Sequence, residues 1–269
     1  MLARPAQISF IGDSHVLIYD DLLFADKAFG GHVVTRAAFL PGFMALGFAD
    51  PTTGMPTKAV LESLRFLLLI GGDGDAFEAL SKIEDGFWMN VHKARARSIM
   101  ETPVVFSCGE LDGRALLREL GTEARFELPF EPSEPLEPIE ESSIIPYSLV
   151  ESRALDFLKP FFAGLSLLHA RGFGHLYVPS LPPPTNDDAL WARFMDVGPT
   201  PRRLRYDVYK VFNHLFARFA AQVGYTFLDL WPQVTKDGLL DPAFGLDGAH
   251  LNKRAATLMV NKIFAHRPA

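Results

Sequence analysis

Short apolar runs alternate with longer stretches of helical periodicity along the chain. Five of these runs are punctuated by Gly, Pro or Asp, as buried parallel strands are. They span residues 7–11, 32–38, 104–107, 175–178 and 225–230. A further apolar run at 66–70 is too short for its periodicity to distinguish a strand from the end of a helix.

The segments between the runs carry apolar residues at helical spacing. The clearest lies at 205–223, where the pattern continues to Val223 and Gly224 ends the helix. The last predicted helix spans 253–264. Strands that alternate with helices predict a parallel sheet covered on both faces, so we expect a single three-layer α/β/α domain over residues 1–269. Active sites of such sheets lie beyond the carboxyl ends of the strands, and Ser14, Gly109 and Pro179 all follow strand ends.

Residues 127–146 break this alternation. They are rich in proline and glutamate and show little periodicity. This composition predicts an extended surface insertion, either a lid over the site or a simple excursion of the chain.

Composition narrows the classes of function. Apolar residues make up 48% of the chain and its net charge is −6, which argues against a nucleic-acid partner. The arginines at 202–205 form the densest basic cluster, which we interpret as a solvated helix start. Cys108 is the sole cysteine, so an intrachain disulfide and a thiolate metal cluster are excluded.

The sequence also predicts where in the cell the protein resides. No apolar run has the length of a membrane span, so we expect no membrane partner. The chain reaches strand-like sequence by Ile8, which leaves no room for a signal peptide and predicts a cytoplasmic protein. The oligomeric state stays open.

Two short motifs at opposite ends of the chain carry candidate chemistry. Residues 11–15 read Ile-Gly-Asp-Ser-His after the first strand, and residues 247–250 read Asp-Gly-Ala-His before the last helix. The first places Ser14 at a strand tip, where Gly12 suits a sharp turn. Together they supply Ser14, His250 and Asp247 for a hydrolase in which the histidine takes the serine proton and the aspartate fixes the imidazole tautomer.

Each motif could instead have a purely structural role. Asp13 or Ser14 could simply cap a helix, and Asp247 could cap the last helix with His250 on the surface. Asp237 and Asp241 are competing carboxylates, although neither shares the local D-x-x-H frame.

With both motifs in place, the chain resembles the SGNH (GDSL-like) hydrolase superfamily, which pairs an N-terminal G-D-S block with a C-terminal D-x-x-H block. The resemblance implies a flavodoxin-like parallel sheet of about five strands. It also implies Ser14 as nucleophile, Asp247 as acid and His250 as base. Gly42 is the best candidate for the glycine whose N–H binds the oxyanion, and Gly47 is the second.

The third block of that family departs from its usual G-x-N-D form. Residues 108–114 read Cys-Gly-Glu-Leu-Asp-Gly-Arg, so Gly109 and Asp112 keep their places while Leu111 replaces the asparagine. The oxyanion would then rely on N–H groups of Ser14 and Gly42, with help near Gly109. Arg114 either donates to the substrate or oxyanion, or forms a helical ion pair with Glu110. His15 is either a pocket residue or a simple turn residue.

These features predict a serine esterase that hydrolyses or transfers a short acyl group through an acyl-serine intermediate, with no cofactor and no metal. O-acetyl groups on a carbohydrate are the substrate that the resemblance implies. Two alternatives stay open: a non-catalytic small-molecule or glycan-binding module, motivated by Leu111, and an acyltransferase that uses the same triad.

Overall fold

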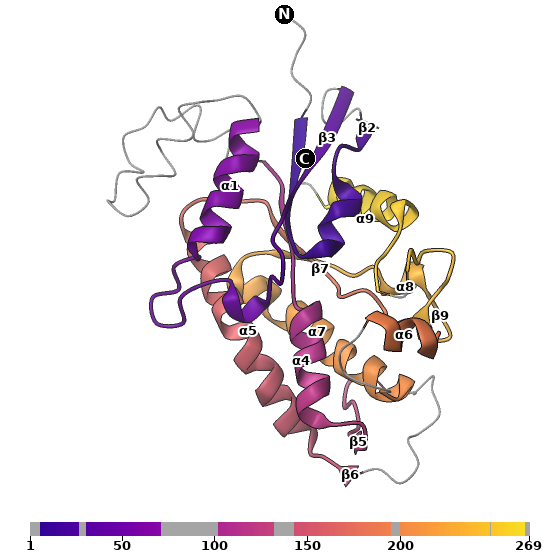
Figure 1. The fold of residues 1–269 in the computed structure, drawn as a ribbon. Coiled ribbons are helices and arrows are strands. Elements are labelled where there is room, and N and C mark those ends of the chain that lie inside the picture. Colours follow the sequence, from indigo (N-terminus) through magenta and orange to yellow (C-terminus); the bar gives the residue numbers. More distant parts are fainter. Residues whose placement is uncertain are drawn as a thin grey trace, which may run out of the picture.

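The computed structural model describes residues 6–26, 31–70, 102–131, 143–194, 200–247 and 249–266. Its central sheet has six strands in the order β2-β3-β1-β4-β7-β8 (Figure 1). The strands are β1 (Ala6–Gly12), β2 (Leu23–Asp26), β3 (Gly31–Phe39), β4 (Val104–Ser107), β7 (Leu176–Pro179) and β8 (Thr226–Leu228). The five strands predicted from the sequence are these, without β2, and they are parallel to one another.

The order of the five parallel strands is 2-1-3-4-5 when they are renumbered among themselves, which is the flavodoxin-like order. The predicted fold class is therefore confirmed, with β2 added as an antiparallel edge strand on β3. Gly12 at the end of β1 is level with Phe39 of β3 and Ser107 of β4. The loops that follow these three strands consequently emerge side by side.

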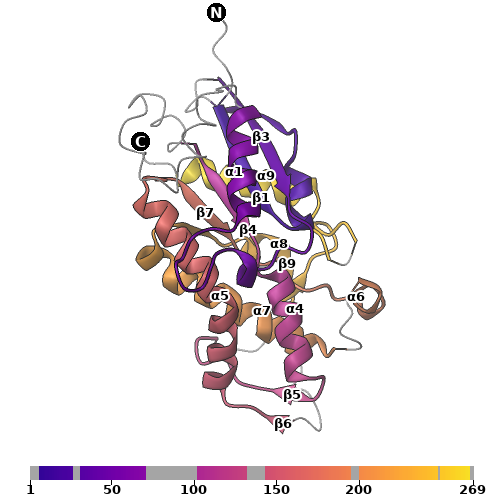
Figure 2. The same cartoon turned by 60° about the vertical axis from the view of Figure 1, so that its left-hand side comes forward.

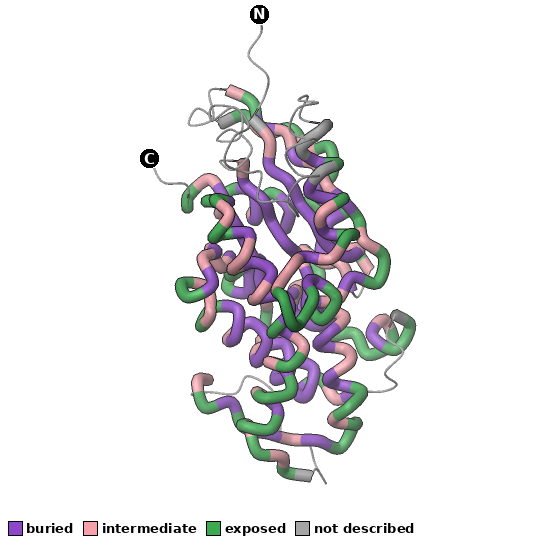
Figure 3. Tube along the Cα trace, turned by 90° about the vertical axis from the view of Figure 1, so that its left-hand side faces the viewer, coloured by how far each residue is buried: buried purple, intermediate pink, exposed green. Residues whose placement is uncertain are grey.

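Helices cover both faces of the sheet. They are η1 (Ser14–Tyr19), η3 (Ala45–Gly47), α1 (Lys58–Ile70), α4 (Glu110–Leu120), α5 (Tyr147–Ala170), α6 (Asp188–Phe194), α7 (Arg202–Val223), α8 (Trp231–Val234) and α9 (Lys253–Ala265). One core joins Ile11 and Phe106 to α1, α4, α5 and α7, and the other joins Phe10 and Val105 to η1, α8 and α9. Alternate residues of β1 and β4 thus enter opposite cores, as expected of a buried parallel sheet, and these strands are buried in Figure 3.

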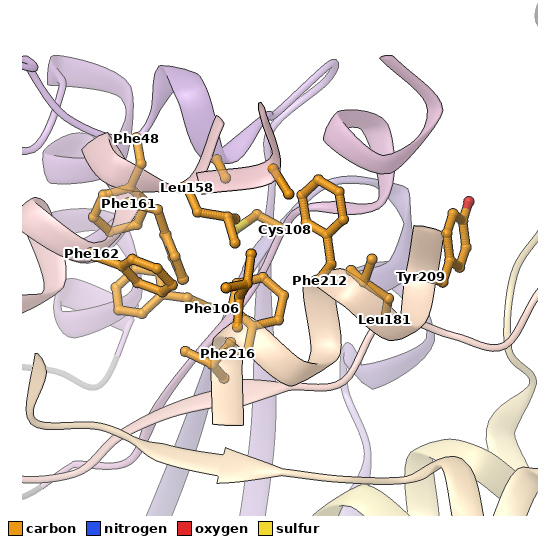
Figure 4. Packing of buried hydrophobic residues seen from close by; sticks show 14 of the residues in the cluster. Phe48, Phe106, Cys108, Leu158, Phe161, Phe162, Leu181, Tyr209, Phe212 and Phe216 are labelled. Carbon is orange, nitrogen blue, oxygen red and sulfur yellow. The ribbon is translucent and has the colours of Figure 1, made fainter. Parts of the chain in front are cut away.

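Aromatic side chains fill the larger core beside the carboxyl edge of the sheet (Figure 4). The Phe48 ring packs edge-on against Phe106 of β4 and Phe161 of α5, with centroid distances of 5.1 and 4.9 Å. A β-carbon at Gly164 of α5 would lie 2.5 Å from the Phe48 ring, so only glycine fits there. This packing fixes η3, which Phe48 follows directly, against α5.

Three further segments lie outside the central sheet. Residues 66–70 are the last turn of α1, so the helical alternative for this run is correct. The predicted insertion at 127–146 follows β5 (Ala124–Arg125) and contains β6 (Ser143–Ile144), which pairs with β5 in parallel near the foot of Figure 2. Its central part, 132–142, lies outside the described residues. β9 (Thr235–Lys236) and β10 (Leu239–Leu240) form a small antiparallel pair.

The interpretation of residues 202–205 as a solvated helix start is wrong for two of the three arginines. Arg203 is 4% exposed and Arg205 is fully buried. Arg203 donates from Nε to Asp207 at 2.8 Å, and the Arg205 guanidinium pairs with Asp188 and lies over the Trp191 ring. Each buried cation is therefore neutralised by a carboxylate, which a basic cluster in the sequence does not reveal.

Within the described part of the chain, no helix combines the length and apolar character needed to cross a membrane.

Candidate active site

Ser14 stands where β1 ends at the carboxyl edge of the sheet. It is the first residue of η1, and the Asp13 carboxylate caps this helix by accepting from the backbone N–H of His15 at 3.0 Å. A β-carbon on Gly12 would lie 2.0 Å from the carbonyl oxygen of Ser107, so glycine is required for β1 to approach β4 this closely. The helix-cap role therefore belongs to Asp13, which leaves the Ser14 hydroxyl free for another partner.

Asp247 and His250 lie in the loop that precedes α9. Oδ1 of Asp247 accepts from the backbone N–H groups of Ala249 at 3.1 Å and His250 at 2.9 Å. The cap of α9 is instead Asn252, whose side chain accepts from the N–H of Arg254 at 2.9 Å. Asp247 consequently orders the loop around His250 and does not cap the helix.

The structure brings these three residues into one hydrogen-bonded line. Nε2 of His250 lies 2.6 Å from Oγ of Ser14, a residue 236 positions away in the sequence. Nδ1 of the same ring lies 2.8 Å from Oδ2 and 2.9 Å from Oδ1 of Asp247. With its proton on Nδ1, the imidazole donates to the carboxylate and Nε2 is free to accept from the serine.

The charge of Asp247 fits this arrangement. Partial burial opposes its ionisation, but the hydrogen bonds from the backbone and ring of His250 prevail and lower its pKa. The competing carboxylates lie elsewhere: Asp241 accepts from the N–H of Ala243, and Asp237 occupies the turn between β9 and β10 with a φ of 52°.

Buried charged and polar side chains form a network next to the turn that carries Ser14. Oε1 of Glu110 accepts from Nε of Arg114 at 2.6 Å and from the hydroxyl of Tyr209 at 2.8 Å. Burial raises the pKa of Glu110, but His15 and Arg114 outweigh it and bring that pKa to about 2. Of the two alternatives that the sequence left open for Arg114, the structure contains the helical ion pair with Glu110. The sequence analysis did not identify Tyr209, because nothing in its local pattern on α7 (Arg202–Val223) points to a partner on α4.

His15 completes this network from the turn that carries Ser14. Its Nε2 lies 3.9 Å from Oε2 of Glu110, and both of its ring nitrogens are buried without a hydrogen-bond partner among the described residues. Burial lowers the pKa of His15, but the negative charges of Asp13 and Glu110 outweigh it and raise that pKa. His15 thus lies beneath the site, close to His250, with its ring enclosed by protein.

Asp13, His15 and Glu110 are also the residues that could hold a metal ion, since one donor atom from each lies within 4.8 Å of the others. Oδ2 of Asp13 is buried without a hydrogen-bond partner in the described chain. Arg114 adds a positive charge to the group. A proton on His15 brings the four side chains to neutrality, whereas a divalent cation beside a neutral His15 would leave a net positive charge.

The two candidate glycines of the oxyanion site occupy different settings. Gly42 adopts a φ of +68° in the turn after β3, and this turn is anchored by the N–H of Leu40, which donates to the Gly12 carbonyl at 2.7 Å. Gly109 adopts a φ of +100° at the start of α4, and a β-carbon there would meet Phe216 and Leu181. The alternative candidate Gly47 is the last residue of η3.

Asp112 faces inward from α4. Its buried carboxylate accepts from the backbone N–H groups of Ala45 at 2.7 Å and Leu46 at 3.2 Å, and so caps η3. Burial raises the pKa of Asp112 to about 6. Leu111, beside it, is partly exposed. Asp112 therefore holds the segment that follows the Gly42 turn, and this is its observed contribution to the site.

Two hollows adjoin this centre. One has a volume of about 690 Å³ and is lined by Ser14 and His250 together with Leu17, Ile18 and Leu246. The other, of about 540 Å³, shares Leu246 and Asp247 with the first and is also lined by polar residues of the 185–188 segment and by Arg202. A bound molecule could thus reach the Ser14–His250 pair from the first hollow.

A scan of the sequence against models of protein families found no match, and a search of curated protein sequences found none. Similar solved structures include a GDSL-like lipase from Bacteroides thetaiotaomicron, with 12% identity, a TM-score of 0.44, and coverage of 99% of this chain and 93% of that one. An aryl esterase from M. smegmatis has 14% identity and a TM-score of 0.43, with 97% and 99% of the two chains covered.

A protein from Bacteroides fragilis, provisionally described as an acylhydrolase, has 13% identity and a TM-score of 0.46, with 98% of this chain and 89% of that one covered. At these identities and TM-scores, neither the family nor the activity of this chain is inferred from the neighbours.

Proposed function

We propose that this chain is a serine esterase that hydrolyses or transfers a short acyl group through an acyl-serine intermediate. The observation that carries the proposal is the line from Ser14 through His250 to Asp247, with contacts of 2.6 and 2.8 Å. Both distances lie within hydrogen-bond reach, which a nucleophile, its base and the group that orients the base require. A binding module would have no need of this alignment.

The reaction follows from the same contacts. Oγ of Ser14 attacks the ester carbonyl while Nε2 of His250 takes its proton, and Asp247 stabilises the imidazolium that forms. As the tetrahedral intermediate collapses, His250 returns the proton to the departing alcohol oxygen. Water then attacks the acyl-serine with the same help from His250, releasing the carboxylic acid and restoring Ser14. In a transfer reaction, a second alcohol replaces that water.

Backbone N–H groups would stabilise the oxyanion in this mechanism. Ser14 opens η1, and the first N–H groups of a helix have no acceptor within it. Gly42 lies in the neighbouring turn, which the Leu40–Gly12 hydrogen bond holds against the end of β1. We propose these two N–H groups as the donors, with Gly109 close to the same edge, because Leu111 offers no amide side chain.

For the alcohol part of the ester we propose a hydroxyl-rich molecule, because the O-acetylated carbohydrates that the family resemblance implies have a carbohydrate as their alcohol part. Support comes from the second hollow, whose lining includes Asn186, Asp187 and Arg202. Amide, carboxylate and guanidinium groups together provide the donors and acceptors that sugar hydroxyls need.

Hydrolysis of p-nitrophenyl acetate and butyrate by the wild type and by Ser14→Ala tests the mechanism. We expect the substitution to lower kcat by about 10³-fold or more, because it removes the nucleophile. Ser152→Ala, at an exposed serine of α5, is the matched control and should keep full activity. Equal rates in the wild type and a folded Ser14→Ala protein would exclude an acyl-serine mechanism.

The carbohydrate proposal has its own test. Asn186→Ala should raise KM for an O-acetylated oligosaccharide while leaving KM for p-nitrophenyl acetate unchanged, because the smaller ester does not reach the second hollow. Identical effects on the two substrates would contradict a sugar site there.

A further inference from the structure

Two exposed leucines lie at the hollow that contains the candidate nucleophile. The side chain of Leu17 is 53% exposed and that of Leu246 is 65% exposed. A single exposed leucine is ordinary in a folded protein. These two, however, line the same hollow of about 690 Å³, and Ser14 and His250 open into it.

The backbone explains how each leucine comes to face the hollow. η1 is a 3₁₀ helix, in which residues three positions apart lie on the same face, so Leu17 is aligned with Ser14. Leu246 precedes Asp247, and its N–H donates to the carbonyl of His250 at 2.8 Å. Both apolar side chains are therefore held by the same short segments that hold the catalytic groups.

We propose that this hollow binds the acyl part of the ester, as an uncharged linear chain of about four to six carbons. The inference rests on the proposed acyl-serine mechanism, because in that intermediate the chain is bonded to Oγ of Ser14 and so begins inside the hollow. The acetyl group that the family resemblance implies is too short to cover Leu17 and Leu246, whereas a butyryl or hexanoyl chain removes their surface from water. For the acyl part of the ester, the hollow therefore favours this longer chain over acetyl. Leu17, Ile18 and Leu246 are thereby assigned as residues that determine acyl-chain length.

The charged groups around the hollow do not select a charged chain. Lys253 and Arg254 also line it, but both are exposed at the start of α9, where long basic side chains keep their charged ends in water. Arg254 in addition lies over the Phe244 ring, 5.5 Å from its centroid. The ionised Asp247 borders the same space and would repel a second carboxylate on the acyl chain.

The test is a series of p-nitrophenyl esters, from acetate through butyrate to hexanoate, with the hemisuccinate as the charged member. For the wild type we expect kcat/KM to rise by about two- to fourfold for each added methylene. Leu17→Asn and Leu246→Asn should each lower the hexanoate-to-acetate ratio of kcat/KM at least about fivefold, because they replace apolar surface with polar surface. Taking this ratio cancels the different intrinsic reactivities of the esters when variants are compared.

Leu23→Asn is the matched control, since Leu23 is also 65% exposed but lies on the edge strand β2. Its ratio should equal that of the wild type. A wild-type series that is flat or falls beyond acetate, with turnover that still depends on Ser14, would overturn this inference and leave the esterase intact. A preference for the hemisuccinate would overturn the inference that the bound acyl chain is uncharged. Loss of Ser14 dependence for every ester would overturn the proposed function itself.

Discussion

The imidazole rings of His15 and His250 lie 4.8 Å apart between centroids, with their planes tilted by 42°. Their surroundings differ in kind. His250 is partly exposed and contacts Ser14 and Asp247, whereas His15 is buried opposite Glu110. In the mechanism that we propose, the His250 ring moves a proton during the reaction, whereas the buried His15 ring lies where it can keep a charge within the fold.

Stability should depend on pH through His15. Burial lowers its pKa, but nearby negative charge prevails and raises it. The charged and titratable groups around it are Asp13 of its own turn, Glu110 and Arg114 of α4, and His250 of the loop before α9. Because the raised pKa belongs to the folded state, the stabilisation is fully present below the ordinary histidine pKa. It is lost as the pH rises through the folded-state pKa.

Urea unfolding of the wild type and His15→Gln, from about pH 6 to pH 9, measures this effect. The free energy of unfolding of the wild type should fall toward that of the variant as the pH rises. Parallel curves over the whole range would mean that His15 carries no proton linked to folding.

The substitution Asp247→Asn should lower kcat by about 10³–10⁴-fold with little change in stability. An amide at this position can donate to Nδ1, which would place the ring proton on Nε2, where it can no longer accept from Ser14. The side-chain oxygen can still accept from the N–H groups of Ala249 and His250, so the loop should keep its shape. Steady-state kinetics with p-nitrophenyl butyrate measure the loss.

Asp241→Asn is the control for this prediction, because the Asp241 carboxylate accepts from the N–H of Ala243 and not from the histidine. It should turn over substrate at the wild-type rate. If Asp241→Asn were the inactive variant and Asp247→Asn the active one, the acid of the triad would be wrongly assigned.

Tyr209→Phe should destabilise the fold by about 1.5–3 kcal/mol, because it removes a buried hydrogen bond to a charged group. The hydroxyl of Tyr209 donates to Oε1 of Glu110 at 2.8 Å, and both residues are buried. Tyr147→Phe is a matched control, since its hydroxyl donates to Glu151 at 3.2 Å in a more open setting. Chemical denaturation of the two variants gives the comparison, and equal losses would show that burial adds nothing to the Tyr209 bond.

The line of Ser14, His250 and Asp247, which we propose as catalytic, could be anticipated from the sequence because its parts lie next to recognisable boundaries. Ser14 follows the first buried strand directly, and Asp247 and His250 share one short loop before the last helix. In a parallel sheet the carboxyl ends of the strands meet at one edge, so a motif after a strand is placed by topology. Local pattern and topology together are therefore enough to predict that these residues meet at one edge of the sheet.

The buried network around Glu110 could not be anticipated in this way. Glu110 and Tyr209 are 99 positions apart, and the helical period of α7 places Tyr209 in the core without naming its partner. Asp112 gave the same difficulty: its contact with Ala45 bridges 67 positions. β2 was missed because a short edge strand carries too little alternation to stand out.

The free energy of unfolding should fall as the pH rises from about 4 through 6, because Asp112 loses its proton over this range. Burial raises its pKa to about 6 in the folded protein, so the folded state holds this proton more tightly than the unfolded chain does. The stabilisation is present below the ordinary aspartate pKa and is lost as the pH passes the folded value. Asp112→Asn mimics the neutral acid, keeps one acceptor for the Ala45 N–H and cannot titrate.

Unfolding free energies of the wild type and Asp112→Asn, measured between about pH 4 and pH 7, test the prediction. Relative to the wild type, the variant should gain stability across this range. Asp50→Asn serves as the control, because Asp50 is exposed and its pKa is lowered by hydrogen bonds from Thr53, so it should give no such gain. A constant difference between the wild type and Asp112→Asn would show that the carboxylate ionises in the fold as readily as in the unfolded chain. Burial would then not govern the charge of the group that holds η3 beside the Gly42 turn.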